Sequence, residues 1–260
     1  MPSFLPFTSF EDLSCFALVL GRTAGIFTAI PMLGGHRVPV RIRVVLIFVM
    51  TLVMFPVIKL KVPELPTDSI SLVILVAREG LVGITLGLLA LVVTEAVSIC
   101  GQIVAMQMGL SVASMFDPSM GQVPIMATFQ SLLAMLLFFT LNIHHLFIRA
   151  MVDSYALVPL GSWHMSGELM QFLVSAVSGA FILGIKLAAP VMVTLLAANV
   201  ALGIMARVFP QMNIFMLSLP LNIGLGFLAL GLSLLVFIHT VQNAYGALPL
   251  QLKALLKLMA

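Results

Sequence analysis

The chain has 260 residues, of which 62% are hydrophobic and only 8% are charged, and its mean hydropathy is +1.22. An ordinary soluble domain has about 25% charged residues, so this composition excludes that class and indicates a membrane protein. The net charge of +3 comes from basic residues that stand singly between apolar runs; they form no basic stripe of the kind that binds nucleic acid, so we expect no nucleic-acid partner.

About twenty apolar residues span a bilayer, and the chain contains about six such runs. The first run contains Arg22, and the third is interrupted by Arg78 and Glu79. The fifth run is longer than a simple span and contains Lys186 and Pro190. We therefore predict an all-α, polytopic membrane protein of about six long, interrupted helices. The six runs are residues 13–33, 44–58, 70–93, 125–147, 169–206 and 214–238.

A basic loop between the first two runs sets the predicted orientation. It contains Arg37, Arg41 and Arg43, so the positive-inside rule places it in the cytoplasm and the N-terminus outside. Alternating spans then place the C-terminus outside, which conflicts with Lys253 and Lys257 in the tail. Either one run is not a true span, or the protein does not sit in lipid as a standard bundle. The polar residues inside nearly every run favour the second interpretation.

Five charged residues inside or beside the apolar runs allow two interpretations. A transporter would use them to carry protons or ions, whereas structural pairs between helices or subunits would satisfy them without transport. We favour structural pairs, because no ordered series of acids and bases emerges. Arg78 and Glu79 are adjacent, so on a helix their side chains point about 100° apart and each needs a different partner. The five residues are Arg22, Arg78, Glu79, Glu95 and Lys186.

The stretch 101–124 differs from the apolar runs around it. It mixes methionines with amides and serines, and Gly109, Pro118 and Gly121 break it. Irregular backbone at membrane depth persists only where protein buries it or where it lines a water-filled cavity, so we interpret this stretch as an interior segment. Its methionines, phenylalanine and glycines suit a deformable apolar constriction; a buried re-entrant connection without a gating role is the alternative.

Eight glycines inside the apolar runs indicate close helix packing. A helix surface without Cβ atoms lets a second backbone approach closely, and in membranes such surfaces mark helix–helix interfaces. We expect these faces to pack against other subunits. The eight residues are Gly83, Gly87, Gly179, Gly184, Gly203, Gly224, Gly226 and Gly231.

The sequence contains no recognisable enzyme motif. A Gly-x-Ser-x-Gly elbow, a His-Glu-x-x-His motif and a phosphate loop are all absent, so we expect no catalytic activity and no cofactor. His144 and His145 are adjacent, and we expect their rings to diverge on a helix instead of chelating one metal ion. Cys15 and Cys100 lack metal-ligand spacing, which favours packed thiols over a disulfide or a metal site.

Three segments together resemble the FliR family of flagellar export-gate proteins. They are G-R-T-A-G-I-F-T-A-I-P-M-L-G at 21–34, Q-M-G-L-S-V-A-S-M-F-D-P at 107–118 and N-V-A-L-G-I-M-A-R-V-F-P-Q-M-N-I-F at 199–215. The likeness covers essentially the whole chain. It implies a subunit of the flagellar type III protein export gate in the bacterial inner membrane, at the flagellar basal body. The closest alternative is the homologous subunit of a virulence injectisome, and an ion-coupled secondary transporter is a more distant one.

The resemblance also implies an arrangement of parts. Residues 1–168 are similar to FliP, and residues 169–260 are similar to a FliQ helical hairpin. The family's plug loop maps onto 107–121, and the hairpin's cytoplasm-facing tip onto 207–213. The implied partners are FliP-like and FliQ-like subunits, FlhB-like and FlhA-like export components, unfolded export substrates and membrane lipid.

The resemblance implies site residues in the plug loop and at the hairpin tip. The gate or plug residues are Met106, Gln107, Met108, Gly109, Leu110, Met115, Phe116, Asp117, Pro118 and Met120. The tip residues are Arg207, Pro210, Gln211 and Asn213.

Overall fold

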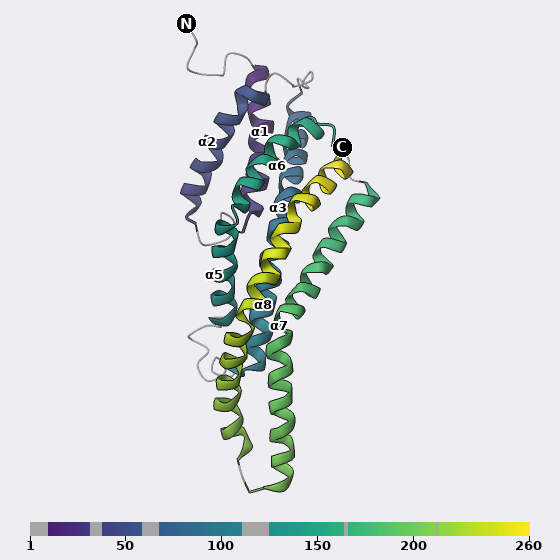
Figure 1. The fold of residues 1–260 in the computed structure, drawn as a ribbon. Coiled ribbons are helices and arrows are strands. Elements are labelled where there is room, and N and C mark those ends of the chain that lie inside the picture. Colours follow the sequence, from purple (N-terminus) through teal and green to yellow (C-terminus); the bar gives the residue numbers. More distant parts are fainter. Residues whose placement is uncertain (1–9, 32–37, 59–67, 111–124, 164–165, 212) are drawn as a thin grey trace. The chain divides into compact units, whose positions relative to one another are not determined.

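The computed structural model describes residues 10–31, 38–58, 68–110, 125–163, 166–211 and 213–260, and the regular elements in these ranges are all helices. Five of the helices are long and apolar enough to cross a membrane, and α5 with α6 makes a sixth candidate if the two count as one span. The predicted all-α, polytopic architecture is confirmed. The helices are α1 (Phe10–Ala29), α2 (Val40–Ile58), α3 (Ser69–Gln107), α5 (Ile125–Thr140), α6 (Ile143–Leu157), α7 (Gly167–Val208) and α8 (Ile214–Met259) (Figure 1).

Helix α3 extends beyond the predicted third run. It continues to Gln107, so residues 101–107 are helical, and the prediction that irregular structure begins at residue 101 is wrong. Cys100, Val104 and Met108 are fully buried at a spacing of four residues. This helical period of buried side chains continues through the glutamines and Gly101, and packing of that stripe keeps the segment helical.

The fourth run is divided into two helices by Leu141 and Asn142. Asn142 precedes α6 with φ 55° and ψ 31°, a left-handed conformation that asparagine adopts more readily than most other residues. Helix α6 then continues to Leu157. Helix α6 therefore extends ten residues beyond the end of the predicted fourth run at residue 147.

The described chain forms two compact units, each built from segments that are distant in the sequence. Unit 1 comprises 1–92, 142–176 and 246–260, and unit 2 comprises 93–141 and 177–245. Helices α3, α7 and α8 contribute to both. The division into a FliP-like part and a FliQ-like part at 168/169 concerns similarity to other proteins, and it stays a prediction.

In unit 1, helices α1 and α3 cross with their backbones in contact. A Cβ atom at Gly83 would lie 2.1 Å from the carbonyl oxygen of Arg22, and one at Gly25 would lie 2.3 Å from the carbonyl oxygen of Gly80. Both distances are far below van der Waals contact, and the opposing atoms are backbone atoms that cannot rotate away. Only glycine fits at Gly25 and Gly83, so these residues determine how closely α1 approaches α3.

Helix α2 packs on α1 through aromatic rings. Phe16 of α1 makes edge-to-face contacts with Phe48 and Phe55 of α2, with ring centroids 5.6 and 5.8 Å apart. Arg41 and Arg43 stand in the first turn of α2, and beyond them its exposed surface is apolar, with Val45 and Val53 exposed. An apolar helix surface is buried by lipid or by other protein, so this part of α2 needs such a cover.

In unit 2, α7 and α8 form an antiparallel hairpin (Figure 1). The Asn222 side chain donates a hydrogen bond from Nδ2 to Oδ1 of Asn199 at 3.0 Å, which joins the two helices about two turns or more from the turn between them. Helix α7 also approaches α3 closely, because a Cβ at Gly184 would lie 2.9 Å from the carbonyl oxygen of Ala96. The second half of α3 is therefore packed against the hairpin.

Candidate functional site

The predicted plug segment begins where α3 ends. The amide of Met108 donates to the carbonyl of Val104 at 2.9 Å, and the amide of Gly109 donates to the carbonyl of Met106 at 3.1 Å. Gly109 has φ +76°, the left-handed conformation with which glycine commonly ends a helix. The helix therefore stops at a defined residue, and the chain changes direction at Gly109.

Met108 attaches this end of α3 to α8. Its side chain is fully buried, and it occupies the space that Gly226 leaves open on α8. A Cβ at Gly226 would lie 2.5 Å from Cγ and 2.9 Å from Sδ of Met108. Gly109 also lies against α8, because a Cβ there would be 3.2 Å from Cδ1 of Leu219. The N-terminal end of the plug segment is therefore fixed to the hairpin within unit 2.

The structure separates the first plug residues into two kinds. Met106 and Gln107 are exposed, whereas Met108 is buried and Leu110 is half-buried. The other predicted gate residues lie in 111–124, outside the described residues, and their role stays a prediction. These are Met115, Phe116, Asp117, Pro118 and Met120.

A buried ion pair lies in unit 1. Arg22 of α1 donates from Nε to Oε2 of Glu79 on α3 at 2.6 Å, and the two side chains are 0% and 1% exposed. Arg22 Nη1 donates to Oγ of Ser154 at 3.2 Å and to the carbonyl of Val158 at 3.1 Å. The prediction that intramembrane charges form structural pairs is confirmed for Arg22 and Glu79, and the pair also joins α6 to α1 and α3.

Ser154, Tyr155 and Gly161 also belong to this cluster, and no pattern in the sequence indicated them. The other carboxylate oxygen of Glu79, Oε1, accepts a hydrogen bond from the amide of Gly161 at 2.9 Å. The guanidinium of Arg22 lies 4.3 Å from the ring centre of Tyr155, a cation–π contact. Ser154, Tyr155 and Gly161 are more than 70 positions from Glu79 and Arg22 in the sequence, so no local spacing indicated their proximity.

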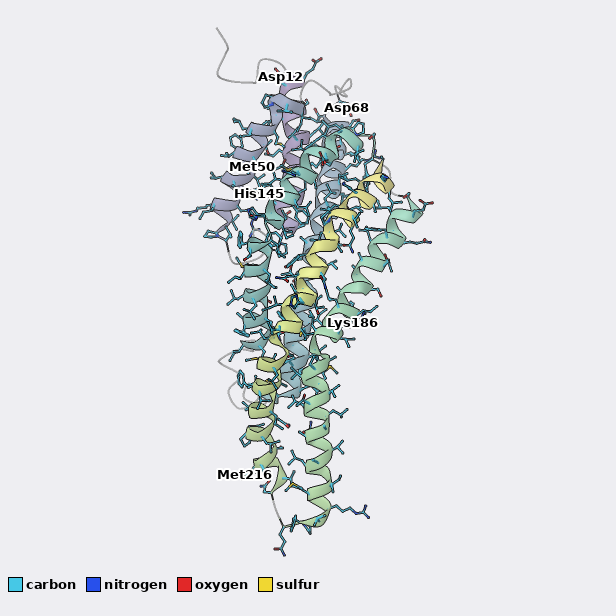
Figure 2. The ribbon with its side chains drawn as sticks, in the orientation of Figure 1. Asp12, Met50, Asp68, His145, Lys186 and Met216 are labelled. Atoms are coloured by element: carbon cyan, nitrogen blue, oxygen red, sulfur yellow. The ribbon has the colours of Figure 1, made fainter. Side chains whose placement is uncertain are left out.

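The other predicted charges are placed differently. Arg78 and Glu79 point in different directions, as predicted: Glu79 is buried and Arg78 is exposed. Glu95 on α3 and Lys186 on α7 (labelled in Figure 2) are also exposed. None of these three exposed residues forms an ion pair within the part of the chain that the structure describes.

The predicted tip of the α7–α8 hairpin is exposed. Arg207 lies in the last turn of α7, and Asn213 precedes α8. The Asn213 side chain accepts a hydrogen bond from the amide of Met216 (labelled in Figure 2) at 3.4 Å, as an N-cap residue does at the start of a helix. The exposed residues of the tip are Arg207, Pro210, Gln211 and Asn213.

The eight glycines divide into two groups. Gly83, Gly87, Gly184 and Gly226 pack against other helices of the same chain, so the prediction that they face other subunits is wrong for these four. Intrachain helices fill the space that their missing side chains leave. The remaining four have open space where a Cβ would stand, with no atom within 4 Å. They are Gly179 and Gly203 on α7, and Gly224 and Gly231 on α8.

His144 and His145 lie next to each other at the start of α6. The rings of His144 and His145 lie 4.2 Å apart with a 38° tilt, so the prediction that they diverge is wrong. Both stand in the first turn of α6, where no preceding helical turn restricts their rotamers. Within the described residues, no group of three or more His, Cys, Asp or Glu side chains is placed to hold a metal ion. Cys15 and Cys100 are both buried, as expected for packed thiols.

The long apolar helices, the glycine crossings and the buried ion pair of Arg22 with Glu79 define a polytopic helical membrane protein. Residues 13–248 match the family of bacterial export proteins, family 1. The chain belongs to this family, and it is a subunit of the flagellar type III export gate.

Known proteins with similar sequences match this chain over most of their length. The chain is 32% identical to the flagellar biosynthetic protein FliR of Bacillus subtilis (strain 168), over 88% of this chain and 90% of that protein. It is 34% identical to FliR of Caulobacter vibrioides, over 86% and 90%. It is 29% identical to FliR of Aquifex aeolicus, over 92% of both. The resemblance inferred from the three sequence segments is confirmed, and the relatives favour the flagellar system over an injectisome.

Proposed function

We propose that this export-gate subunit lies in the bacterial inner membrane and closes a protein-conducting channel with residues 107–121. The observation that carries the proposal is the attachment of Met108, the second residue of this segment, to α8 at Gly226. A plug has to stay in place when the channel is closed and yield when a substrate passes. A segment whose first residues are fixed and whose following residues are rich in Met, Gly and Ser meets both conditions.

The composition of the segment suits an unfolded substrate. An exported polypeptide needs an opening of variable width that otherwise blocks ions and water, and an apolar constriction closes by excluding water. Methionine side chains are unbranched and adapt to irregular surfaces. Asp117 and Pro118 favour a turn, because Asp bonds to nearby backbone and Pro fixes its own φ; we infer that this turn directs Phe116 into the channel.

We propose that the chain works in a complex with FliP-like and FliQ-like subunits, and that FlhB-like and FlhA-like components act with it. The exposed apolar face of α2 and the open glycines of the α7–α8 hairpin support this proposal, since both need a cover of protein or lipid. In this complex, residues 1–168 occupy a position like that of a FliP subunit, and residues 169–260 occupy a position like that of a FliQ subunit. The chain acts by lining and plugging a channel, without catalysis and without a cofactor.

Deletion of residues 107–121 tests the plug. We expect the overproduced complex to make the membrane permeable to small ions, measured as ion flux into intact cells or into proteoliposomes. The matched control is Asp153→Asn, which removes an exposed charge on α6 and leaves the flux at the wild-type level. A deletion complex that is intact by co-purification and shows wild-type flux contradicts the plug assignment.

Purification from native membranes tests the partners. We expect the tagged chain to co-elute with FliP-like and FliQ-like subunits, identified by mass spectrometry, and to be degraded or aggregated when it is expressed alone. A folded, monodisperse monomer in detergent that captures none of these subunits from native membranes contradicts the assembly proposal.

A further inference from the structure

Arg78 lies on an exposed apolar face of α3. The residues that share this face are Val73, Ile74, Ala77, Arg78, Leu81 and Ile84, and all six are exposed. Their spacing follows the helical period, so they form one stripe along unit 1, which we call the Arg78 face. It carries a single charge among aliphatic side chains, and Val73 at its start is 67% exposed.

Arg78 contrasts with its neighbour Glu79. Both carboxylate oxygens of Glu79 accept a hydrogen bond, one from Arg22 and one from the amide of Gly161. Arg78 makes no ion pair or hydrogen bond with the residues that the structure describes. Its guanidinium, which presents five N–H donors in a rigid fork, is therefore available for an external acceptor.

Lipid is an unsuitable cover for this face. Arg78 lies nine residues after Ser69, the first residue of α3, a helix that is long and apolar enough to cross a membrane. A charged side chain on a membrane-spanning helix faces a partner or a water-filled space in known membrane proteins, and hydrocarbon does not solvate it. Aliphatic residues precede and follow Arg78 on the face, so the surface is apolar except at one point.

We propose that the Arg78 face is an interface with a neighbouring subunit, whose helix covers the aliphatic stripe and places an Asp or Glu carboxylate against the Arg78 guanidinium. This inference rests on the proposed function, because it assumes assembly with other export-gate subunits. A carboxylate on the neighbour would complement the Arg78 charge, and arginine with a carboxylate forms the bidentate pair that holds one geometry. Glu79, the acidic residue next to Arg78, is already paired with Arg22, so we assign the acid to the neighbour.

Charge reversal tests the pair. Tagged wild type, Arg78→Glu and Arg78→Lys are expressed in cells that lack the native chain, membranes are solubilised in a mild detergent, and co-purified subunits are quantified. We expect Arg78→Glu to lower the yield of a co-purified subunit at least about tenfold, because it buries two like charges together. Arg78→Lys keeps the charge and retains an intermediate yield. The matched control is Arg149→Glu, the same reversal at an exposed position of α6, which leaves the yield at the wild-type level.

A photo-crosslinking residue at Val73 identifies the cover without relying on the folding of a charge variant. We expect an adduct with a subunit of the complex. An Asp→Arg or Glu→Arg change in the crosslinked helix then restores the yield of Arg78→Glu. Adducts with lipid alone, or a wild-type yield for Arg78→Glu, overturn the inference. Rescue of Arg78→Glu by an acidic-to-basic change elsewhere in the same chain also overturns it, because the acid would then be internal.

The wild-type chain separates this inference from the proposed function. If wild type captures the export-gate subunits and Arg78→Glu captures them equally, only the interface assignment fails. If wild type captures none of them, the assembly proposal fails first.

Discussion

Arg22 and Glu79 are 57 positions apart in the sequence, yet Nε of Arg22 lies 2.6 Å from Oε2 of Glu79 in the interior of unit 1. Ser154, Val158 and Gly161 contribute the remaining hydrogen bonds. One carboxylate and one guanidinium therefore join α1, α3, α6 and the segment after α6. Both charges are shielded from lipid and water, so each depends on the other.

Glu79→Gln is expected to destabilise the chain strongly. It leaves the Arg22 charge buried without a counter-charge, and removal of one partner of a buried pair costs about 3–5 kcal/mol. Thermal denaturation of the purified complex in detergent measures the change. Asp153→Asn is the control, because Asp153 is exposed on α6 and its loss leaves the melting temperature unchanged. A Glu79→Gln complex that melts with wild type would show that the pair contributes nothing to stability.

Gly83→Ala is expected to separate α1 from α3. The new methyl group meets the carbonyl oxygen of Arg22 at 2.1 Å, and a backbone atom has no rotamer by which to move aside. Overpacking of this kind costs about 1–3 kcal/mol or more. Gly246→Ala is the matched control, because it adds the same methyl group inside α8 with no atom within 4 Å. Accumulation in membranes and resistance to limited proteolysis compare the two, and equal behaviour of both variants rules out a tight crossing.

Gly226→Ala is expected to loosen the attachment of the plug segment. The added methyl group overlaps Cγ of Met108, which is a flexible side chain, so Met108 moves while the helices stay folded. If 107–121 is the plug, ion flux through the complex rises. The double variant Met108→Ala, Gly226→Ala restores the space and returns the flux toward wild type. Gly224→Ala, two residues away with open space at its Cβ, is the control, and equal flux in it and in Gly226→Ala contradicts the prediction.

The Asn199–Asn222 hydrogen bond is expected to stabilise the α7–α8 hairpin by a measurable amount. A double-mutant cycle with Asn199→Ala and Asn222→Ala isolates the interaction from the effect of each substitution alone. Interhelical hydrogen bonds in membrane proteins couple by about 0.6 kcal/mol on average and about 1.7 at most. Melting of the four complexes gives the coupling energy. A coupling of zero means that the hydrogen bond does not contribute to the stability of the hairpin.

The sequence by itself determined the class, the all-α architecture and the family of this protein. Composition and the length of the apolar runs decide membrane insertion, because they depend on local hydrophobicity alone. The divergent directions of Arg78 and Glu79 also followed from the helical period, which is a local property.

Only the tertiary structure decided which charges pair and which glycines are buried within the chain. Arg22 could have met any of the acidic residues, and the choice of Glu79 depends on how α1 crosses α3 at Gly25 and Gly83. The helical continuation of α3 to Gln107 has the same origin, because Gly101 packs against Ala127 of α5 and Met108 packs against Gly226 of α8. Pairing and packing are relations between distant segments, and no local pattern in a single sequence contains them.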